Sequence, residues 1–333
     1  MRLKGQPPQT ATFTRKTDAL LWAQRVEADI RAGRHFPGNE ARKRTLAELI
    51  ERYRREVLPQ YGRREQKQRS SKLAWWSSKL GTRLLSDLTP AAISEAKTRL
   101  AGGEGPSGKP ASPATQVRYL AALRHVLAIA KREWQWVGDN PAQQVRAPRE
   151  PRGRLRYLSE EERDRLLEAC KASDDPRLYP FVIVALGTGA RRGEVVGLRW
   201  RDIDLQRGTA TLQETKNSER RTLVLAGRVL EVLRELGAVR RIDTDEVFTG
   251  RHGIAAFPRK PWDAALKRAK IEDFHFHDLR HTFASHLAMS GATLAELAEA
   301  LGHKTLAMVK RYAHLSEQHT SHVVGRYVER FLG

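Results

Sequence analysis

Cysteine is nearly missing from this chain of 333 residues, since Cys170 is the single one. One thiol excludes a disulfide framework and a cysteine-rich zinc site built within the chain. Long apolar runs are missing too, because no stretch reaches the roughly 18 residues that a membrane-spanning helix requires. The N-terminus also lacks the apolar region of a signal peptide. We therefore expect a protein of the reducing cytoplasm with no membrane partner.

Acidic side chains are scarce relative to basic ones. The chain has 39 Asp and Glu residues against 60 Lys and Arg residues, which leaves a formal net charge of +21. This excess indicates a polyanionic partner, and nucleic acid is the first candidate, although ribosomal and membrane-surface proteins share the property. Hydrophobic residues make up 40% of the chain, which suits packed cores and argues against global disorder.

Four segments differ in composition and pattern. Residues 1–40 contain too little structure to bury a core, and we interpret them as a minimal or truncated segment. Residues 41–148 predict a helical domain, and residues 149–156 predict an extended basic linker. Residues 157–333 predict a domain of helices with a small hairpin between residues 209 and 225. The expected fold class is mainly α with a small β-sheet or hairpin: a helical domain followed by a mixed α/β domain.

Local signals place several elements. Thr12-Phe13-Thr14 predicts a short strand, and Thr17 is the expected cap of the helix that follows. Thr45 and Ser159 each begin a capping-box pattern, with a glutamate three residues later whose side chain can satisfy a free backbone N–H. Ser112-Pro113 places a cap before a proline at the first helical position.

Six side chains after residue 185 carry chemistry suited to phosphoryl transfer without a metal: Arg191, Lys216, His277, Arg280, His303 and Tyr312. Two arginines can hold both non-bridging oxygens of a phosphate by forked hydrogen bonds. A tyrosine can attack phosphorus and form a covalent intermediate. A lysine or a histidine can protonate the leaving oxygen. Each residue taken singly also has an ordinary structural role.

A zinc site is the alternative reading of the histidines. His277 and His281 are spaced i and i+4, which puts both on one helix face. However, the glutamate that a His-Glu-x-x-His metallohydrolase places after its first histidine is absent. We therefore expect neither a metal nor a cofactor.

In this order the residues resemble the tyrosine recombinase family, and phage-type integrases in particular. The resemblance covers about residues 45 to 330. Its motifs are Thr188-Gly189-Ala190-Arg191 with Glu194, the stretch His277-Asp278-Leu279-Arg280-His281-Thr282-Phe283-Ala284, and Leu301-Gly302-His303 followed by Arg311-Tyr312-Ala313-His314. Lys216 resembles the family's hairpin lysine, which implies that it protonates the 5′-oxygen of the cleaved strand.

The resemblance implies a mechanism. Tyr312 would attack a DNA phosphate, form a 3′-phosphotyrosyl link and release a 5′-hydroxyl. Arg191 and Arg280 would bind the scissile phosphate, with His303 as a third donor. Glu194 would orient Arg191. His277 would assist proton transfer, but the base that deprotonates Tyr312 stays open.

The resemblance also implies how DNA is held. Residues 41–148 resemble a core-binding domain, which would close a clamp on DNA with the catalytic domain, and residues 1–40 resemble an arm-type DNA-binding module with strands missing. The basic side chains expected to meet phosphates are Arg42, Lys43, Arg44, Arg63, Arg64, Lys67, Arg69 and Lys72. The alternative is that they lie on solvated helix faces, which we expect for about half of them. The implied partners are double-stranded DNA attachment sites, bound by a homo-tetramer once the sites are synapsed. The need for a host DNA-bending protein and a directionality factor stays open.

The sequence is compatible with three alternative functions: a DNA-binding protein without catalysis, a type IB topoisomerase-like enzyme and a chromosomal dimer-resolving enzyme. The complete catalytic set disfavours the first, and the helical segment before the linker disfavours the second. The extra N-terminal segment weighs mildly against the third. We therefore predict a recombinase that integrates or excises a mobile element.

Overall fold

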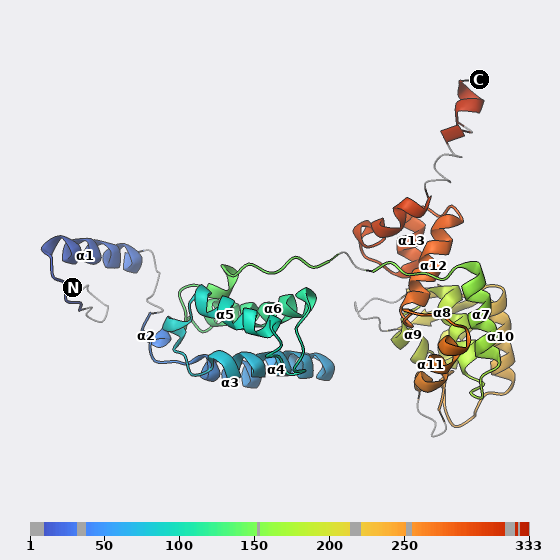
Figure 1. The fold of residues 1–333 in the computed structure, drawn as a ribbon, viewed down its shortest axis with the longest axis horizontal. Helices are drawn as coiled ribbons and strands as arrows, with labels where there is room; N and C mark the ends of the chain where they lie inside the picture. Colours follow the sequence, from blue (N-terminus) through green and yellow to red (C-terminus); the bar gives the residue numbers. More distant parts are fainter. Residues whose placement is uncertain are drawn as a thin grey trace. The chain divides into compact units, whose positions relative to one another are not determined.

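The computed structural model describes residues 10–31, 38–151, 154–213, 221–250, 255–316, 324–325 and 327–332. The chain divides into two compact units, Met1–Arg152 and Gly153–Gly333 (Figure 1), and this division lies inside the stretch 149–156 that was expected to be a linker. The expected fold class is confirmed, because helices dominate both units and a small sheet lies in the second. Within the described ranges, no helix combines the length and the apolar character needed to cross a bilayer.

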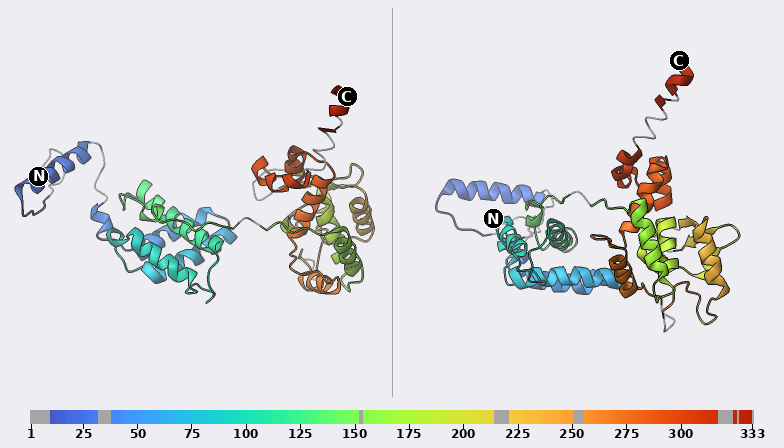
Figure 2. Two further views of the ribbon diagram at one scale, coloured as in Figure 1. Left: turned by 45° about the horizontal axis from the view of Figure 1, so that its top comes forward. Right: turned by 45° about the vertical axis from the view of Figure 1, so that its right-hand side comes forward.

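The regular elements in the described part of the first unit are all helices (Figure 2). Its elements are α1 (Lys16–Arg31), α2 (Gly38–Ala41), α3 (Leu46–Glu56), η1 (Leu58–Gln60), α4 (Arg63–Leu80), η2 (Leu85–Asp87), α5 (Pro90–Ala101), α6 (Pro113–Arg132) and η3 (Pro141–Gln143). Helix α4 packs against α3 and α6, and α5 packs against α6. The shared apolar faces of these four helices form the core.

Capping explains where these helices begin. The predicted capping box at Thr45 is confirmed, since its backbone N–H donates to Glu48 Oε2 at 2.7 Å and its hydroxyl accepts from the Glu48 N–H at 3.3 Å. The predicted start at Ser112 is confirmed in the same way. The strand predicted at Thr12-Phe13-Thr14 is wrong: these residues are irregular, and the Phe13 ring packs 5.5 Å from that of Trp22. A strand requires a neighbouring strand, and the described residues 10–31 supply none.

Two tryptophans of α4 fill the core of the first unit. Trp76 is 0% exposed, and its indole N–H donates to the Tyr119 carbonyl at 2.8 Å. The indole N–H of Trp75 donates to the Glu104 carbonyl at 2.8 Å. Since both indoles are buried and hydrogen-bonded, they pack helices together rather than offering a surface on which bases could stack.

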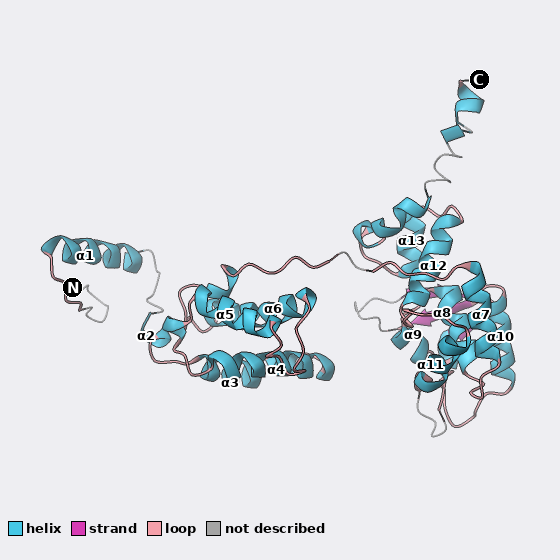
Figure 3. Cartoon of the chain, in the orientation of Figure 1, coloured by secondary structure: helices cyan, strands magenta, loops and turns pink. Residues whose placement is uncertain are grey.

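In the second unit, helices pack around a small sheet (Figure 3). Its helices are α7 (Glu160–Lys171), α8 (Leu178–Thr188), α9 (Arg192–Val196), η4 (Trp200–Asp202), α10 (Arg228–Ala238), α11 (Arg259–Arg268), α12 (Asp278–Met289), α13 (Leu294–Leu301), η5 (Leu306–Met308) and η6 (Lys310–Ser316). The strands are β1 (Ile203–Asp204), β2 (Thr209–Leu212) and β3 (Arg221–Val224), antiparallel in the order β1-β2-β3. The predicted hairpin is therefore confirmed as β2 and β3. Strand β1 was not predicted, because two residues carry no alternation that a sequence can show.

Helix α8 is the apolar centre of this unit and contacts α7, α10 and α12. It ends at Gly189, whose left-handed backbone (φ +61°) turns the chain sharply towards Arg191. A Cβ at Gly189 would lie 2.4 Å from the Phe283 ring of α12, so only glycine allows the end of α8 to approach α12 this closely.

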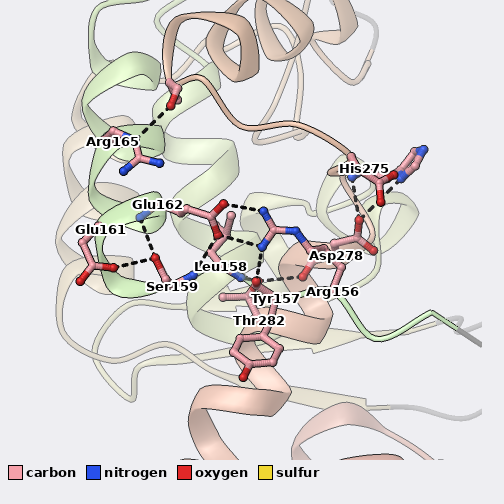
Figure 4. A network of polar contacts seen from close by, with 12 residues as sticks. Arg156, Tyr157, Leu158, Ser159, Glu161, Glu162, Arg165, His275, Asp278 and Thr282 are labelled. Carbon is pink, nitrogen blue, oxygen red and sulfur yellow. Dashed lines mark hydrogen bonds and ion pairs between the residues drawn. The ribbon is translucent and has the colours of Figure 1, made fainter.

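Residues just after the unit boundary contact both α7 and α12 (Figure 4). The backbone N–H of Leu158 donates to the Thr282 hydroxyl at 3.1 Å, and Arg156 forms an ion pair with Glu162 at 2.5 Å. Arg154 donates to the Asp278 carboxylate at 2.7 Å. The chain thus enters the second unit bound to the helix that carries the second predicted motif.

Candidate active site

Arg280 lies at the centre of the predicted catalytic residues and is only 5% exposed. One of its terminal nitrogens donates to the Gly189 carbonyl at 2.7 Å, and the other donates to the Leu301 carbonyl at 2.6 Å. That second nitrogen also lies 2.8 Å from His303 Nε2. The ends of α8 and α13 therefore hold Arg280 in one position, although 91 residues separate it from Gly189 in the chain.

The charge at this site is strongly positive. Burial, together with the charges of Arg191 and Arg221, lowers the pKa of Arg280 to about 10. Arg280 still carries its charge at neutral pH, so the cost of holding these guanidinium groups together remains unless an anion arrives. A phosphate would offset this cost, which makes the site a ready receptor for one.

Glu194 is the carboxylate that organises the arginines. It accepts from the side chain of Arg191 at 2.6 Å and from the Arg191 backbone N–H at 2.8 Å, as the third residue of the short helix α9. Its second oxygen lies 3.4 Å from the guanidinium of Arg221. One buried carboxylate thus binds the arginine that precedes α9 and an arginine from β3.

Arg221 is a site residue that sequence reasoning missed. Its side chain is 9% exposed, and it donates to the Ala300 carbonyl as well as to Glu194. Its stem passes so close to Gly302 that a Cβ there would lie 2.5 Å from Arg221 Cδ. In the sequence, nothing distinguishes Arg221 from the many other basic residues of the chain. The one signal was Gly302 in Leu301-Gly302-His303, because a glycine often marks a place where another group comes close to the backbone.

Tyr312 is buried, with 2% of its surface exposed. Its hydroxyl lies 2.6 Å from Nδ1 of His281 on α12. His277, the residue expected to assist Tyr312, is exposed just before α12 and has its ring centre 5.3 Å from that of His281. The sequence indicated His281 only as a possible metal partner, and among the described residues no group of three metal-binding side chains forms.

Burial determines the protonation of these groups. It lowers the pKa of both His281 and His303 to about 4, with the nearby arginines adding to the effect at His303. Burial also raises the pKa of Tyr312. At neutral pH both imidazoles are therefore neutral, and in the tautomer that carries its proton on Nε2, His281 Nδ1 accepts the hydrogen bond of the Tyr312 hydroxyl.

The predicted hairpin lysine and the predicted DNA-binding residues lie apart from this cluster in the sequence. Lys216 lies outside the described residues. In the first unit, five of the predicted DNA-binding residues are exposed: Arg42, Lys43, Arg63, Arg64 and Lys67. Arg44 instead pairs with Glu40 at 3.1 Å, Arg69 stacks 3.9 Å from the centre of the Tyr61 ring, and Lys72 donates to a backbone carbonyl at 3.0 Å.

The sequence and the fold both match known proteins. Residues 156–319 match the model of the phage integrase family. The integrase of Salmonella phage P22 is 35% identical over 68% of this chain, and the match spans 60% of that protein. The shufflon-specific DNA recombinase of Escherichia coli is 32% identical over 84% of this chain and 71% of that protein.

Two solved structures share the fold at low identity. The Tn1549 transposon integrase in complex with a circular intermediate DNA has a TM-score of 0.67 at 17% identity, covering 81% of this chain and 95% of that one. A lambda integrase dimer bound to a core site has a TM-score of 0.66 at 18% identity, covering 79% and 97%. The chain therefore belongs to the phage integrase family and is a tyrosine recombinase, a site-specific enzyme that breaks and rejoins DNA strands.

Proposed function

We propose that this recombinase integrates or excises a mobile DNA element by way of a covalent link between Tyr312 and a DNA 3′-phosphate. The observation that carries this proposal is that Arg191, Arg280 and His303 lie together in one positively charged site. Tyr312 lies on η6, which packs against α12, the helix that carries Arg280. Phosphoryl transfer depends on positioning and on stabilising the charge that develops on phosphorus oxygens. Donors already held in place by the protein meet that demand.

The scissile phosphate would be bound by Arg280 and Arg191. Arg280 is held by two backbone carbonyls and Arg191 by Glu194, so neither guanidinium has to be ordered when DNA arrives. His303 accepts from Arg280 through Nε2, which leaves Nδ1 as the ring nitrogen that carries the proton. Two oriented guanidinium groups and one imidazole thereby surround the place of the phosphate.

The cleavage step exchanges one ester for another. A bond forms between Tyr312 Oη and phosphorus while the bond from phosphorus to the 5′-oxygen breaks. Lys216 supplies the proton that the departing 5′-oxygen takes up. Since a phosphodiester is replaced by a phosphotyrosyl ester, a free 5′-hydroxyl can reverse the step without nucleotide hydrolysis.

DNA binding by the first unit is the second part of the proposal. The five exposed basic residues lie at the start of α4 and just before α3, where they are available to phosphates. Residues 41–148 would be the core-binding domain, 149–156 the linker and 157–333 the catalytic domain, with residues 1–40 as a minimal arm-type segment. We propose a homo-tetramer on two synapsed attachment sites. A host DNA-bending protein and a directionality factor are further partners to test. The relatives come from bacteria and their phages, so the cytoplasm is the compartment we propose.

Covalent trapping tests the nucleophile. The protein would be incubated with nicked duplexes drawn from the DNA that flanks its gene and then analysed on denaturing gels. Wild type should give a protein–DNA adduct that survives denaturation, and Tyr312→Phe should give none because the attacking oxygen is gone. Tyr157→Phe, which removes a hydroxyl elsewhere in the same unit, is the matched control and should form the adduct.

Two outcomes would contradict this proposal. An adduct that persists in Tyr312→Phe would assign the nucleophile to another residue. Relaxation of any supercoiled plasmid without a site preference would favour a topoisomerase-like enzyme instead.

A further inference from the structure

We propose that His281 is the proton acceptor for Tyr312 in strand cleavage and the proton donor to it in rejoining, an inference that rests on the proposed function. His281 Nδ1 lies 2.6 Å from the Tyr312 hydroxyl, which is the distance of a strong hydrogen bond. The two side chains come from α12 and η6, which pack against each other. The centres of the two rings are 6.0 Å apart, and the ring planes are inclined by 44°.

Burial limits where the tyrosine proton can go. Tyr312 is 2% exposed, so its hydroxyl has almost no contact with bulk water. A proton that leaves a buried hydroxyl must pass to a group within hydrogen-bond reach. Among the described residues, His281 is the one whose side chain bonds this hydroxyl.

The other two histidines of the site are placed for different tasks. Nε2 of His303 lies 2.8 Å from Arg280, on the side of the phosphate site. The ring of His277 is exposed and lies beside His281, with 5.3 Å between ring centres. His277 therefore contacts the proposed acceptor rather than the nucleophile.

The charged groups around His281 explain why the proton stays on Tyr312 before DNA binds. Burial and His277 lower the pKa of His281 to about 4, Arg311 and Arg280 act in the same direction, and Asp278 opposes them. A scissile phosphate would bring negative charge next to these arginines. That charge stabilises an imidazolium, so transfer becomes favourable only once the substrate is bound.

Proton and bond changes balance in both directions. In cleavage the Oη–H proton moves to His281 Nδ1 as the Oη–phosphorus bond forms, and the bond from phosphorus to the 5′-oxygen breaks as Lys216 gives that oxygen its proton. In rejoining, the 5′-hydroxyl returns its proton to Lys216 and attacks phosphorus, the Oη–phosphorus bond breaks, and the imidazolium of His281 returns its proton to Oη. One residue thus serves as base and then as acid.

The test measures single-turnover cleavage of the nicked duplex by the full-length chain as a function of pH. His281→Gln keeps a polar side chain at this position but cannot take up a proton. We expect its cleavage rate to fall by roughly 10²- to 10⁴-fold, the usual contribution of general acid–base catalysis, while DNA affinity is kept. His286→Gln is the matched control on the same helix, since the amide can still donate to the Leu158 carbonyl that His286 contacts; its rate should match wild type.

Chemical rescue distinguishes a proton acceptor from a purely structural residue. His281→Ala should recover part of its cleavage rate when free imidazole is added, and Tyr312→Phe should recover none. Unchanged cleavage in His281→Gln, with the adduct still lost in Tyr312→Phe, would overturn this inference and leave the proposed function standing. A fall that is equal at every pH and insensitive to imidazole would overturn it as well. Absence of any Tyr312-dependent adduct in wild type would overturn both proposals.

Discussion

At the scale of single residues, the proposed phosphate site depends on a carboxylate that two arginines share. Glu194 binds Arg191 and Arg221, and Arg221 also donates to the carbonyl of Ala300. Because the Arg221 side chain is buried, its loss leaves the Glu194 carboxylate and the Ala300 carbonyl without this donor in a place that water does not reach. It also removes the stem that packs on Gly302. Arg221 therefore stabilises the loop that presents His303.

Replacing Arg221 tests this role. Arg221→Ala should lower the free energy of unfolding by ~1–3 kcal/mol, the cost of buried polar groups left without partners, measured by urea denaturation. Arg221→Lys should retain only part of the stability that Arg221→Ala loses, because an ammonium group lacks the forked hydrogen-bond geometry of a guanidinium group. Arg259→Ala removes an exposed guanidinium, 70% accessible and paired with Asp263, and should change stability little. Equal effects of Arg221→Ala and Arg259→Ala would contradict the structural role of Arg221.

At the scale of elements, the entry segment of the second unit and α12 form one hydrogen-bonded assembly. Asp278, in the first turn of α12, accepts from Arg154 at 2.7 Å and from the backbone N–H of His275 at 2.7 Å. An acidic residue there also interacts favourably with the positive end of the helix. The position of α12, and of Arg280 on it, therefore depends on residues next to the unit boundary.

Asp278→Asn should loosen this assembly. The amide removes the ion pair with Arg154 and the charge at the helix start, so amides of α12 and of residues 156–158 should exchange hydrogen faster. Hydrogen exchange followed by mass spectrometry measures this directly. Asp263→Asn, which removes an exposed ion pair on α11, is the control. Unchanged protection of α12 in Asp278→Asn would show that apolar packing alone holds the helix.

Some elements were predictable from the sequence and others were not, depending on how far apart the interacting residues are. The helix starts at Thr45 and Ser159 follow from hydrogen bonds between residues three positions apart, which the sequence states directly. The strand predicted at Thr12-Phe13-Thr14 failed because a strand also requires a partner. Strand β1 was missed for the converse reason: β2 pairs with it although its own two residues carry no pattern.

At the scale of the whole molecule, the charge of +21 should make DNA binding strongly dependent on salt. Each phosphate contact releases condensed counterions, and the logarithm of the binding constant falls by about 0.9 per contact for each unit of log salt. Arg63→Gln with Arg64→Gln should therefore reduce the slope by roughly 2 and weaken binding to every sequence alike. Fluorescence anisotropy over a series of KCl concentrations measures it.

Arg69→Gln is the comparison for this prediction. Arg69 pairs with Glu65 at 2.8 Å and stacks on Tyr61, so its loss should affect the stability of the helical unit more than the salt slope. A flat salt response of the wild-type protein would count against DNA binding by this surface. A fall of the slope by about 1 in Arg69→Gln, the value for one lost contact, would place Arg69 among the phosphate contacts.

The sequence by itself determined the chemical class of this protein and where several of its helices begin. Arginines, histidines and a tyrosine in a fixed order indicated phosphoryl transfer, and caps, prolines and glycines marked where helices begin and end. Only the tertiary structure decided that His281 rather than His277 contacts Tyr312, that Arg221 joins the site, and that Arg69 is engaged while Arg63 is exposed. The physical reason is range. Caps and turns are hydrogen bonds between near neighbours, whereas a contact such as that of Arg280 with Gly189 depends on how distant helices pack.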